Sequence, residues 1–278
     1  MINKFDTLKL SGEAELPPIL GKKSFDKPSL FTPRNLLHQA RRQRGLQAGN
    51  IPAFCVLDPD GDLFRYLRSC GGRKNPFWAC YHTELYEMEV DKTPVGVVGC
   101  AVGASFAVLV AEQLFASGCL FLMSVTSAGQ ILPAGSPPYF VLIDRALRDE
   151  GTSYHYLPPS PYSRIHEDLL SMIQTGMPDS IPLMEGSTWT TDAPFRETEK
   201  ALAFARSEGL TAVEMEAAAL YAFAQAQNKP VICFAHVTNQ MGLVDKDFEK
   251  GEENGNKSFT ELISAVIKIC KARGKYIM

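Results

Sequence analysis

The stretch from Thr211 to Gln225 constrains this chain most, because it sets two carboxylates into an otherwise apolar run, TAVEMEAAALYAFAQ. The part AAALYAFAQ is apolar on every face, which predicts a helix enclosed by protein. Side chains two residues apart share a face only in extended backbone, so Glu214 and Glu216 point one way only if they precede that helix. A charge in such a place is costly unless it is paired or hydrogen-bonded.

Two interpretations of this acid pair follow. The ordinary one is a cap, since a carboxylate gains free energy at the positive end of a helix dipole. The other is a functional site, and the rest of the chain decides how much weight it receives.

The composition is typical of a globular protein and argues against several classes of function. The 278 residues are 45% hydrophobic and carry a formal net charge of -3, without a long run of either sign. We therefore expect neither nucleic acid nor a membrane surface as the main partner. Seven scattered cysteines without a C-x-x-C motif indicate free thiols in a reduced, cytoplasmic protein. The five histidines have no ligand spacing, so no metal site is predicted.

Short apolar runs alternate with helical patterns along the chain, which predicts a three-layer α/β/α fold around a mostly parallel or mixed sheet. Strands are expected at Ala53–Leu57, Val95–Gly99, Cys119–Val125, Tyr139–Ile143 and Pro230–Val237. Helices are expected at Pro33–Arg44, Leu63–Ser69, Ala104–Ser117, Ser163–Gln174, Glu197–Ser207 and Ser258–Ala272. Thr126–Gly129 is expected to be a turn. Residues 1–50 form an arm with one helix, and residues 51–278 form a single domain.

Four of the expected strands end in loops that suit a ligand site. In an open α/β sheet, ligands collect at the carboxyl ends of the strands. The loops are Gly61–Arg65, Gly99–Gly103, Thr126–Gly129 and Thr238–Gln240. Glycine-rich turns present backbone N–H groups to an anion, and Arg65 adds a bidentate donor. Each loop alone is more often structural than functional.

The order of these loops resembles that of the nucleoside phosphorylase/uridine phosphorylase family, which also contains nucleosidases. The most specific match is VEMEAAALYAFA, close to the family's V-E-M-E-A signature. DGDLFR resembles its G-D-P-x-R phosphate loop, GCAVG its G-x-G-x-G turn, and SVTSAG its R-x-G-(S/T)-x-G segment. TTDAPFRE and HVTNQ lie where the family has its S-x-D and V-S-D loops. The match covers roughly residues 53–272.

The resemblance implies a phosphorylase-type fold and cleavage of an N-glycosidic bond, with phosphate as co-substrate and neither a metal nor an organic cofactor. It implies catalytic roles for Glu216, Asn239 and Asp192. It implies nucleoside contacts from Met215, Glu214, Ser127, Arg196 and Phe195, and phosphate contacts from Gly61, Arg65 and Ser127. It also implies a homo-oligomer, because members of the family complete their sites with residues from a neighbouring subunit. For Glu214 a capping role is equally expected.

Three residues depart from the family pattern. Ser124 stands in place of a phosphate-binding Arg, Thr126 in place of a Gly, and Asn239 where purine-specific members carry Asp. Arg41, Arg73 and Lys74 are candidates to replace the missing charge. A neutral amide at Asn239 with Arg196 nearby favours a base rich in carbonyl groups. A phosphorylase is therefore the first hypothesis. A nucleosidase that uses water and a nucleoside-binding protein without turnover are the alternatives.

Overall fold

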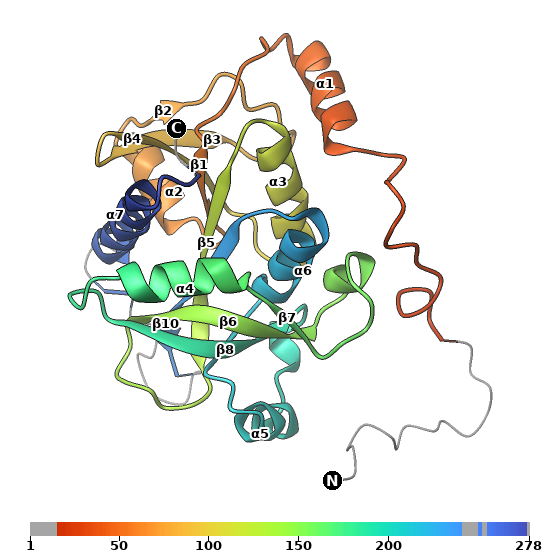
Figure 1. The fold of residues 1–278 in the computed structure, drawn as a ribbon, viewed down its shortest axis with the longest axis vertical. Helices are drawn as coiled ribbons and strands as arrows, with labels where there is room; N and C mark the ends of the chain where they lie inside the picture. The colour runs from red at the N-terminus through yellow and green to blue at the C-terminus, as the bar shows by residue number, and fades with distance from the viewer. Residues whose placement is uncertain (1–15, 241–249, 252–254, 277–278) are drawn as a thin grey trace.

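The computed structural model describes residues 16–240, 250–251 and 255–276. Within these residues a ten-stranded mixed sheet is covered by helices on both faces (Figure 1). The strands are β1 (Phe54–Asp58), β2 (Arg73–Lys74), β3 (Leu85–Val90), β4 (Thr93–Gly99), β5 (Phe121–Gln130), β6 (Tyr139–Asp149), β7 (Tyr162–Arg164), β8 (Leu183–Thr191), β9 (Ala212–Glu214) and β10 (Val231–Asn239). The α-helices are α1 (Pro33–Arg44), α2 (Asp62–Ser69), α3 (Ala104–Ala116), α4 (Glu167–Gly176), α5 (Glu199–Ser207), α6 (Ala217–Gln227) and α7 (Asn256–Ala272), and two short 3-10 helices are η1 (Thr152–His155) and η2 (Pro194–Arg196).

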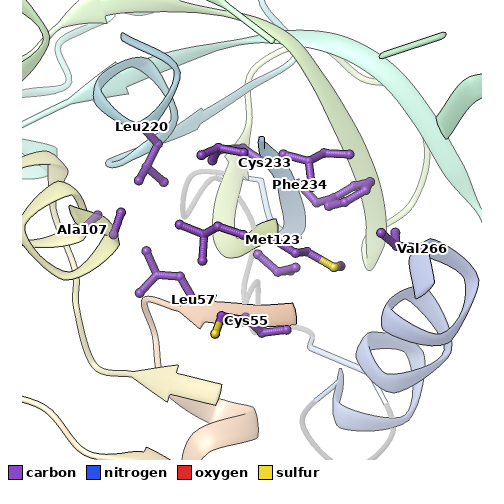
Figure 2. Close-up of a cluster of buried hydrophobic side chains, with 14 of the residues drawn as sticks. Cys55, Leu57, Ala107, Met123, Leu220, Cys233, Phe234 and Val266 are labelled. Atoms are coloured by element: carbon purple, nitrogen blue, oxygen red, sulfur yellow. The ribbon is translucent and has the colours of Figure 1, made fainter. Parts of the chain in front are cut away.

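The three layers follow from the apolar side chains of the central strands. Leu220 of α6 and Ala107 of α3 lie on one side of β1, β5 and β10, and Val266 of α7 lies on the other (Figure 2). Strands buried on both faces are mostly apolar, as in β1, where every residue is buried and only the last, Asp58, is charged. The predicted α/β/α class is confirmed, with a mixed rather than purely parallel sheet.

The strand order brings two groups of strand ends together. It runs β10-β6-β8-β9-β5-β1-β4-β3-β2, and β10 also pairs with β5. This additional pairing closes part of the sheet into a ring made of β5, β10, β6, β8 and β9. On one side β1, β4, β5 and β10 form a parallel group, and on the other β6, β8 and β9 do. The long strand β5 belongs to both groups, because its end pairs with β9 in the antiparallel sense.

The helix α1 has the ends that the sequence predicts. The Thr32 side chain accepts a hydrogen bond from the backbone of Asn35 at 3.2 Å, Pro33 starts the helix, and Gly45 ends it with φ of 64°. Its buried residues Leu37 and Ala40 are on the face that lies against α3. Most of the other predicted helices and strands are also present, with their ends shifted by a few residues.

The turn predicted at Thr126–Gly129 is wrong. These residues continue β5, because Thr126 pairs with Ala235 of β10 and Gly129 pairs with Val213 of β9. Pairing on both sides outweighs the low strand propensity of glycine. The prediction also missed β8, whose sequence LMEGSTWTT contains too few apolar residues to read as a strand.

Candidate active site

Glu214, the last residue of β9, is bound at the start of α6. Its carboxylate accepts hydrogen bonds from the backbone N–H groups of Glu216 and Ala217, each at 2.7 Å. The hydroxyl groups of Thr188 and Thr190 on β8 donate to its other oxygen. Four protein donors around one buried carboxylate give it the geometry of a helix cap. Its assignment to nucleoside binding stays a prediction.

Glu216 makes different contacts, although it lies only two residues further on. Its Oε1 accepts a hydrogen bond from the backbone of Gly103 at 2.6 Å, and its Oε2 accepts one from Thr126 Oγ1 at 2.8 Å. Glu216 is the N-cap residue of α6, yet its side chain caps none of the helix N–H groups. The capping interpretation therefore fits Glu214 and not Glu216. Glu216 instead joins the loop after β4 to the middle of β5.

The charge on the Glu214 carboxyl disfavours ionisation of the Glu216 carboxyl. Burial raises the pKa of both, and Glu214 has the larger share of donors to its ionised form. Burial, with the Glu214 charge second, raises the pKa of Glu216 to about 8. Without a ligand, Glu216 is therefore the group that keeps a proton at neutral pH. A positive charge that develops beside Glu216 favours its ionised form.

The loop after β1 is fastened by Asp58, which is buried. Its carboxylate accepts hydrogen bonds from the backbone of Gly61 at 3.0 Å and of Phe64 at 2.9 Å. Gly61 has φ of 79°, and a Cβ atom there would lie 2.5 Å from Cys100 Sγ. Only glycine fits this position. Burial raises the pKa of Asp58 to about 6.

Arg65 of α2 is turned back onto its own loop. Its Nη2 donates to the Asp60 carbonyl oxygen at 2.7 Å and to Asp62 Oδ1 at 3.1 Å. Lys250 Nζ pairs with the other oxygen of Asp62 at 2.5 Å. The Arg65 side chain is 56% exposed. Two cations and an acid thus surround Gly61, where the resemblance predicts phosphate.

The backbone N–H of Ser127 is already bound by a carboxylate. It donates to Asp60 Oδ2 at 2.7 Å, so a negatively charged side chain takes a donor that the resemblance assigns to phosphate. Ser124, in place of the family Arg, is 1% exposed and pairs in register with Leu57 and Cys233. Its hydroxyl finds no hydrogen-bond partner among the described residues. This position therefore supplies no cation.

The residues predicted for the base lie at the ends of β8 and β10. We call residues 192–198 the base-side loop. Asp192 Oδ2 accepts a hydrogen bond from the backbone of Gly151 at 2.8 Å, whereas α5 is capped by Thr198. Asp192 therefore does not cap α5. Phe195 is 98% exposed, and Arg196 is also exposed. Asn239 ends β10, beside Gly129 of β5.

The fold brings most of the predicted residues to one region. Glu216 is bonded to Thr126, the neighbour of Ser127, whose N–H is bound by Asp60 of the loop after β1. Glu214 pairs in register with Thr190 of β8, two residues before the base-side loop. Met215 is half-buried at the same strand end. Sequence reasoning missed the roles of Asp60 and Thr126. The Thr126 hydroxyl was visible only as a departure from a family glycine, and Asp60 only as part of a turn.

Within residues 16–240, 250–251 and 255–276, no group of three or more His, Cys, Asp or Glu side chains is arranged to hold a metal ion. Over the same part of the chain, every helix is too short or too polar to cross a bilayer.

Comparison with known proteins gives the family. A model described as the phosphorylase superfamily matches residues 56–268. The chain belongs to the phosphorylase superfamily. This match contains every residue that the resemblance assigned to the site. In the comparison with curated proteins, no match was found.

Solved structures of superfamily members share the fold at low sequence identity. A uridine phosphorylase from Vibrio fischeri ES114 is 15% identical, with a TM-score of 0.68 over 83% of this chain and 99% of that chain. An AMP nucleosidase from Bacteroides thetaiotaomicron VPI-5482 is 18% identical, with a TM-score of 0.66 over 87% and 100%. A purine nucleoside phosphorylase from Toxoplasma gondii is 13% identical, with a TM-score of 0.65 over 80% and 91%. Enzymes named as phosphorylases and enzymes named as nucleosidases thus share this fold.

Proposed function

We propose that this protein cleaves the N-glycosidic bond of a nucleoside and that Glu216 binds the ribose hydroxyl groups. The observation that carries this proposal is that the Glu216 carboxyl is buried, is not a cap, and faces the loop after β4 and the middle of β5. As the bond to the base breaks, the sugar gains positive charge. A preorganised carboxylate next to the ribose stabilises that charge, and no metal or organic cofactor is required for it.

The contacts on the nucleophile side support water as the acceptor. The Ser127 N–H donates a hydrogen bond to Asp60 Oδ2 at 2.7 Å. A phosphate dianion that used the same N–H would be repelled by the Asp60 carboxylate. Ser124 supplies no compensating charge. In hydrolysis, a water oxygen bonds to the anomeric carbon while the glycosidic bond breaks, and the base leaves with the electron pair. Asp60 takes the proton that the water loses, and the base takes up a proton at nitrogen.

Phosphate is the second candidate, and it is the acceptor that the sequence favours. Gly61 with positive φ, Arg65 and Lys250 form a cationic edge to the same loop. Protonation or displacement of Asp60 would free the Ser127 N–H for a phosphate oxygen. The product would then be ribose 1-phosphate in place of ribose.

For the base, a ring rich in carbonyl groups remains the proposal. Asn239 donates and accepts through its amide but does not titrate, so it cannot protonate a departing purine as an acid would. Arg196 is exposed on the base-side loop and presents a fixed set of donors that suits carbonyl oxygens. Inosine, guanosine and uridine should be cleaved faster than adenosine. Efficient cleavage of adenosine with the other three inert would contradict this.

We also propose that the active form is a homo-oligomer. Two candidates for a cation donated to a neighbour are engaged within their own chain, since Arg73 pairs with Glu87 and Lys74 pairs with Glu84. Arg41 on α1 remains a candidate, because its Nε is buried without a hydrogen-bond partner among the described residues. A neighbour that supplied a cation would favour phosphate as the acceptor.

The test compares two substitutions on the same loop. A nucleoside panel is incubated with and without phosphate, and ribose and ribose 1-phosphate are separated. For a nucleosidase, activity is independent of phosphate, Asp60→Asn loses roughly two to four orders of magnitude in kcat, and Arg65→Met retains most of it. For a phosphorylase, Arg65→Met raises the phosphate KM and Asp60→Asn lowers it. Nucleoside binding without any product would support a binding protein and contradict catalysis.

A further inference from the structure

The N-terminal arm, defined here as residues 16–31, has two side chains that are less exposed than the rest. Every residue of the arm is exposed except Ile19 and Lys23, which are half-buried. They are four residues apart across a turn closed by hydrogen bonds from Leu20 and Gly21 to Pro17 and Pro18. Both side chains reach the same short segment of the protein, at Gly151 and His155. The arm therefore has a defined seat.

That seat is the segment from Gly151 to His155, which contains η1. A Cβ atom on Gly151 would lie 3.4 Å from Ile19 Cδ1, so the Ile19 side chain lies beside Gly151. Lys23 Nζ and His155 Nδ1 are 2.8 Å apart. Figure 1 shows the arm passing beside the chain that follows β6.

The segment from Gly151 to His155 is anchored by the buried guanidinium group of Arg148. Arg148 is 4% exposed and donates to the hydroxyl groups of Ser153 and Ser160 and to the carbonyl oxygens of Leu157 and Pro158. The Glu150 carboxylate accepts hydrogen bonds from the backbone of Thr152 and Ser153. A buried Arg whose acceptors are all neutral is costly to desolvate, so its side chain is fixed by this loop.

The same segment is also hydrogen-bonded to the base-side loop. The Gly151 N–H that lies beside Ile19 donates to Asp192 Oδ2 at 2.8 Å. The two loops start together, because Asp149 of β6 pairs in register with Thr191 of β8. Ile19 Cδ1 and Asp192 Oδ2 thus both lie near Gly151, at 3.4 Å and 3.7 Å from the position that a Cβ atom there would take.

We propose that the N-terminal arm positions the base-side loop through Gly151, with Ile19 and Lys23 as positioning residues. Loss of the arm contacts loosens the segment 151–155, which weakens the hydrogen bond from Gly151 to Asp192. The arm and its helix precede residues 56–268, the part matched by the superfamily model, so this device belongs to the N-terminal extension of the chain. Its effect on substrate rests on the proposed function, but its effect on the loop does not.

The first test measures amide hydrogen exchange in the full-length protein by mass spectrometry. Exchange in residues 192–198 should be roughly three- to tenfold faster in Ile19→Ala and in Lys23→Ala than in the wild type, with α3 unchanged. Lys27→Ala is the matched control, because Lys27 is on the same arm, 72% exposed, and pairs with its neighbour Asp26. Wild-type exchange in both variants would overturn the proposal. Equal acceleration in α3 would also overturn it, since that pattern means a general loss of stability.

The second test uses a nucleoside that the wild type cleaves. Ile19→Ala should raise KM for the nucleoside by roughly three- to tenfold and leave kcat within about twofold. In an Asp192→Ala background the same substitution should change KM by less than about twofold, because the hydrogen bond from Gly151 to Asp192 is already absent. Additive effects would overturn the proposal. If the wild type cleaves no nucleoside, the proposed function fails, and hydrogen exchange still decides the role of the arm.

Discussion

At the scale of single residues, Glu216 is the group on which activity depends most. Glu216→Gln keeps an oxygen that can accept the hydrogen bond from Gly103 or Thr126, so the fold should persist. It removes the charge that stabilises the sugar in the transition state. We expect kcat to fall by roughly two to four orders of magnitude, with the melting temperature unchanged at neutral pH, because the free protein already carries a proton on Glu216 there. Normal turnover would contradict the role.

The same carboxyl predicts a pH dependence. Burial and the Glu214 charge raise the pKa of Glu216 to about 8, so the free protein gains the ionised form as pH rises through that value. We expect kcat/KM to increase with pH between about 7 and 9, and this step should be absent from the residual activity of Glu216→Gln.

The sign for stability is the opposite. The unfolded chain releases this proton near the ordinary pKa of Glu, while the folded chain keeps it up to about 8. Over that window the folded state binds more protons, so this group makes the free energy of unfolding fall as pH rises. A flat kcat/KM profile together with pH-independent unfolding would contradict the raised pKa.

At the scale of elements, the start of α6 depends on Glu214. Glu214→Ala leaves two backbone N–H groups and two hydroxyl groups without their acceptor in a buried place. We expect the free energy of unfolding to drop by about 3 kcal/mol. Thr198→Ala on α5 is the control, since an exposed cap costs only about 1 kcal/mol. Chemical denaturation measures both, and equal losses would show that Glu214 is an ordinary cap.

The elements also show how far the sequence alone predicts this structure. Local signals predicted α1 correctly, because Thr32, Pro33 and Gly45 act within one turn of the chain. The order of the loops predicted the family. The turn at Thr126–Gly129 was wrong because strand pairing with β9 and β10 comes from residues far along the chain.

Within the site, too, local contacts could be predicted from the sequence and contacts between distant residues could not. The pattern of two acids indicated a cap or a site, and the structure assigns one role to each acid through Thr188 and Thr190 on one side and Thr126 on the other. The hydrogen bond from the Ser127 N–H to Asp60 was not predictable, since it joins β5 to the loop after β1, 67 residues away in sequence. Local chemistry fixes caps and turns, whereas partners across the sheet require the fold.

At the scale of the whole molecule, apolar surface predicts association with a second copy. Leu30 is 100% exposed and Phe31 69% at the start of α1, and Phe195 is 98% exposed on the base-side loop. Adjacent exposed apolar side chains that serve no partner are unusual on a monomer. We expect light scattering on the eluted protein to give a multiple of the chain mass. Leu30→Asp combined with Phe31→Asp should shift it toward the monomer, whereas Lys27→Ala should not. A wild type that is monomeric at micromolar concentration and fully active would contradict an oligomeric site.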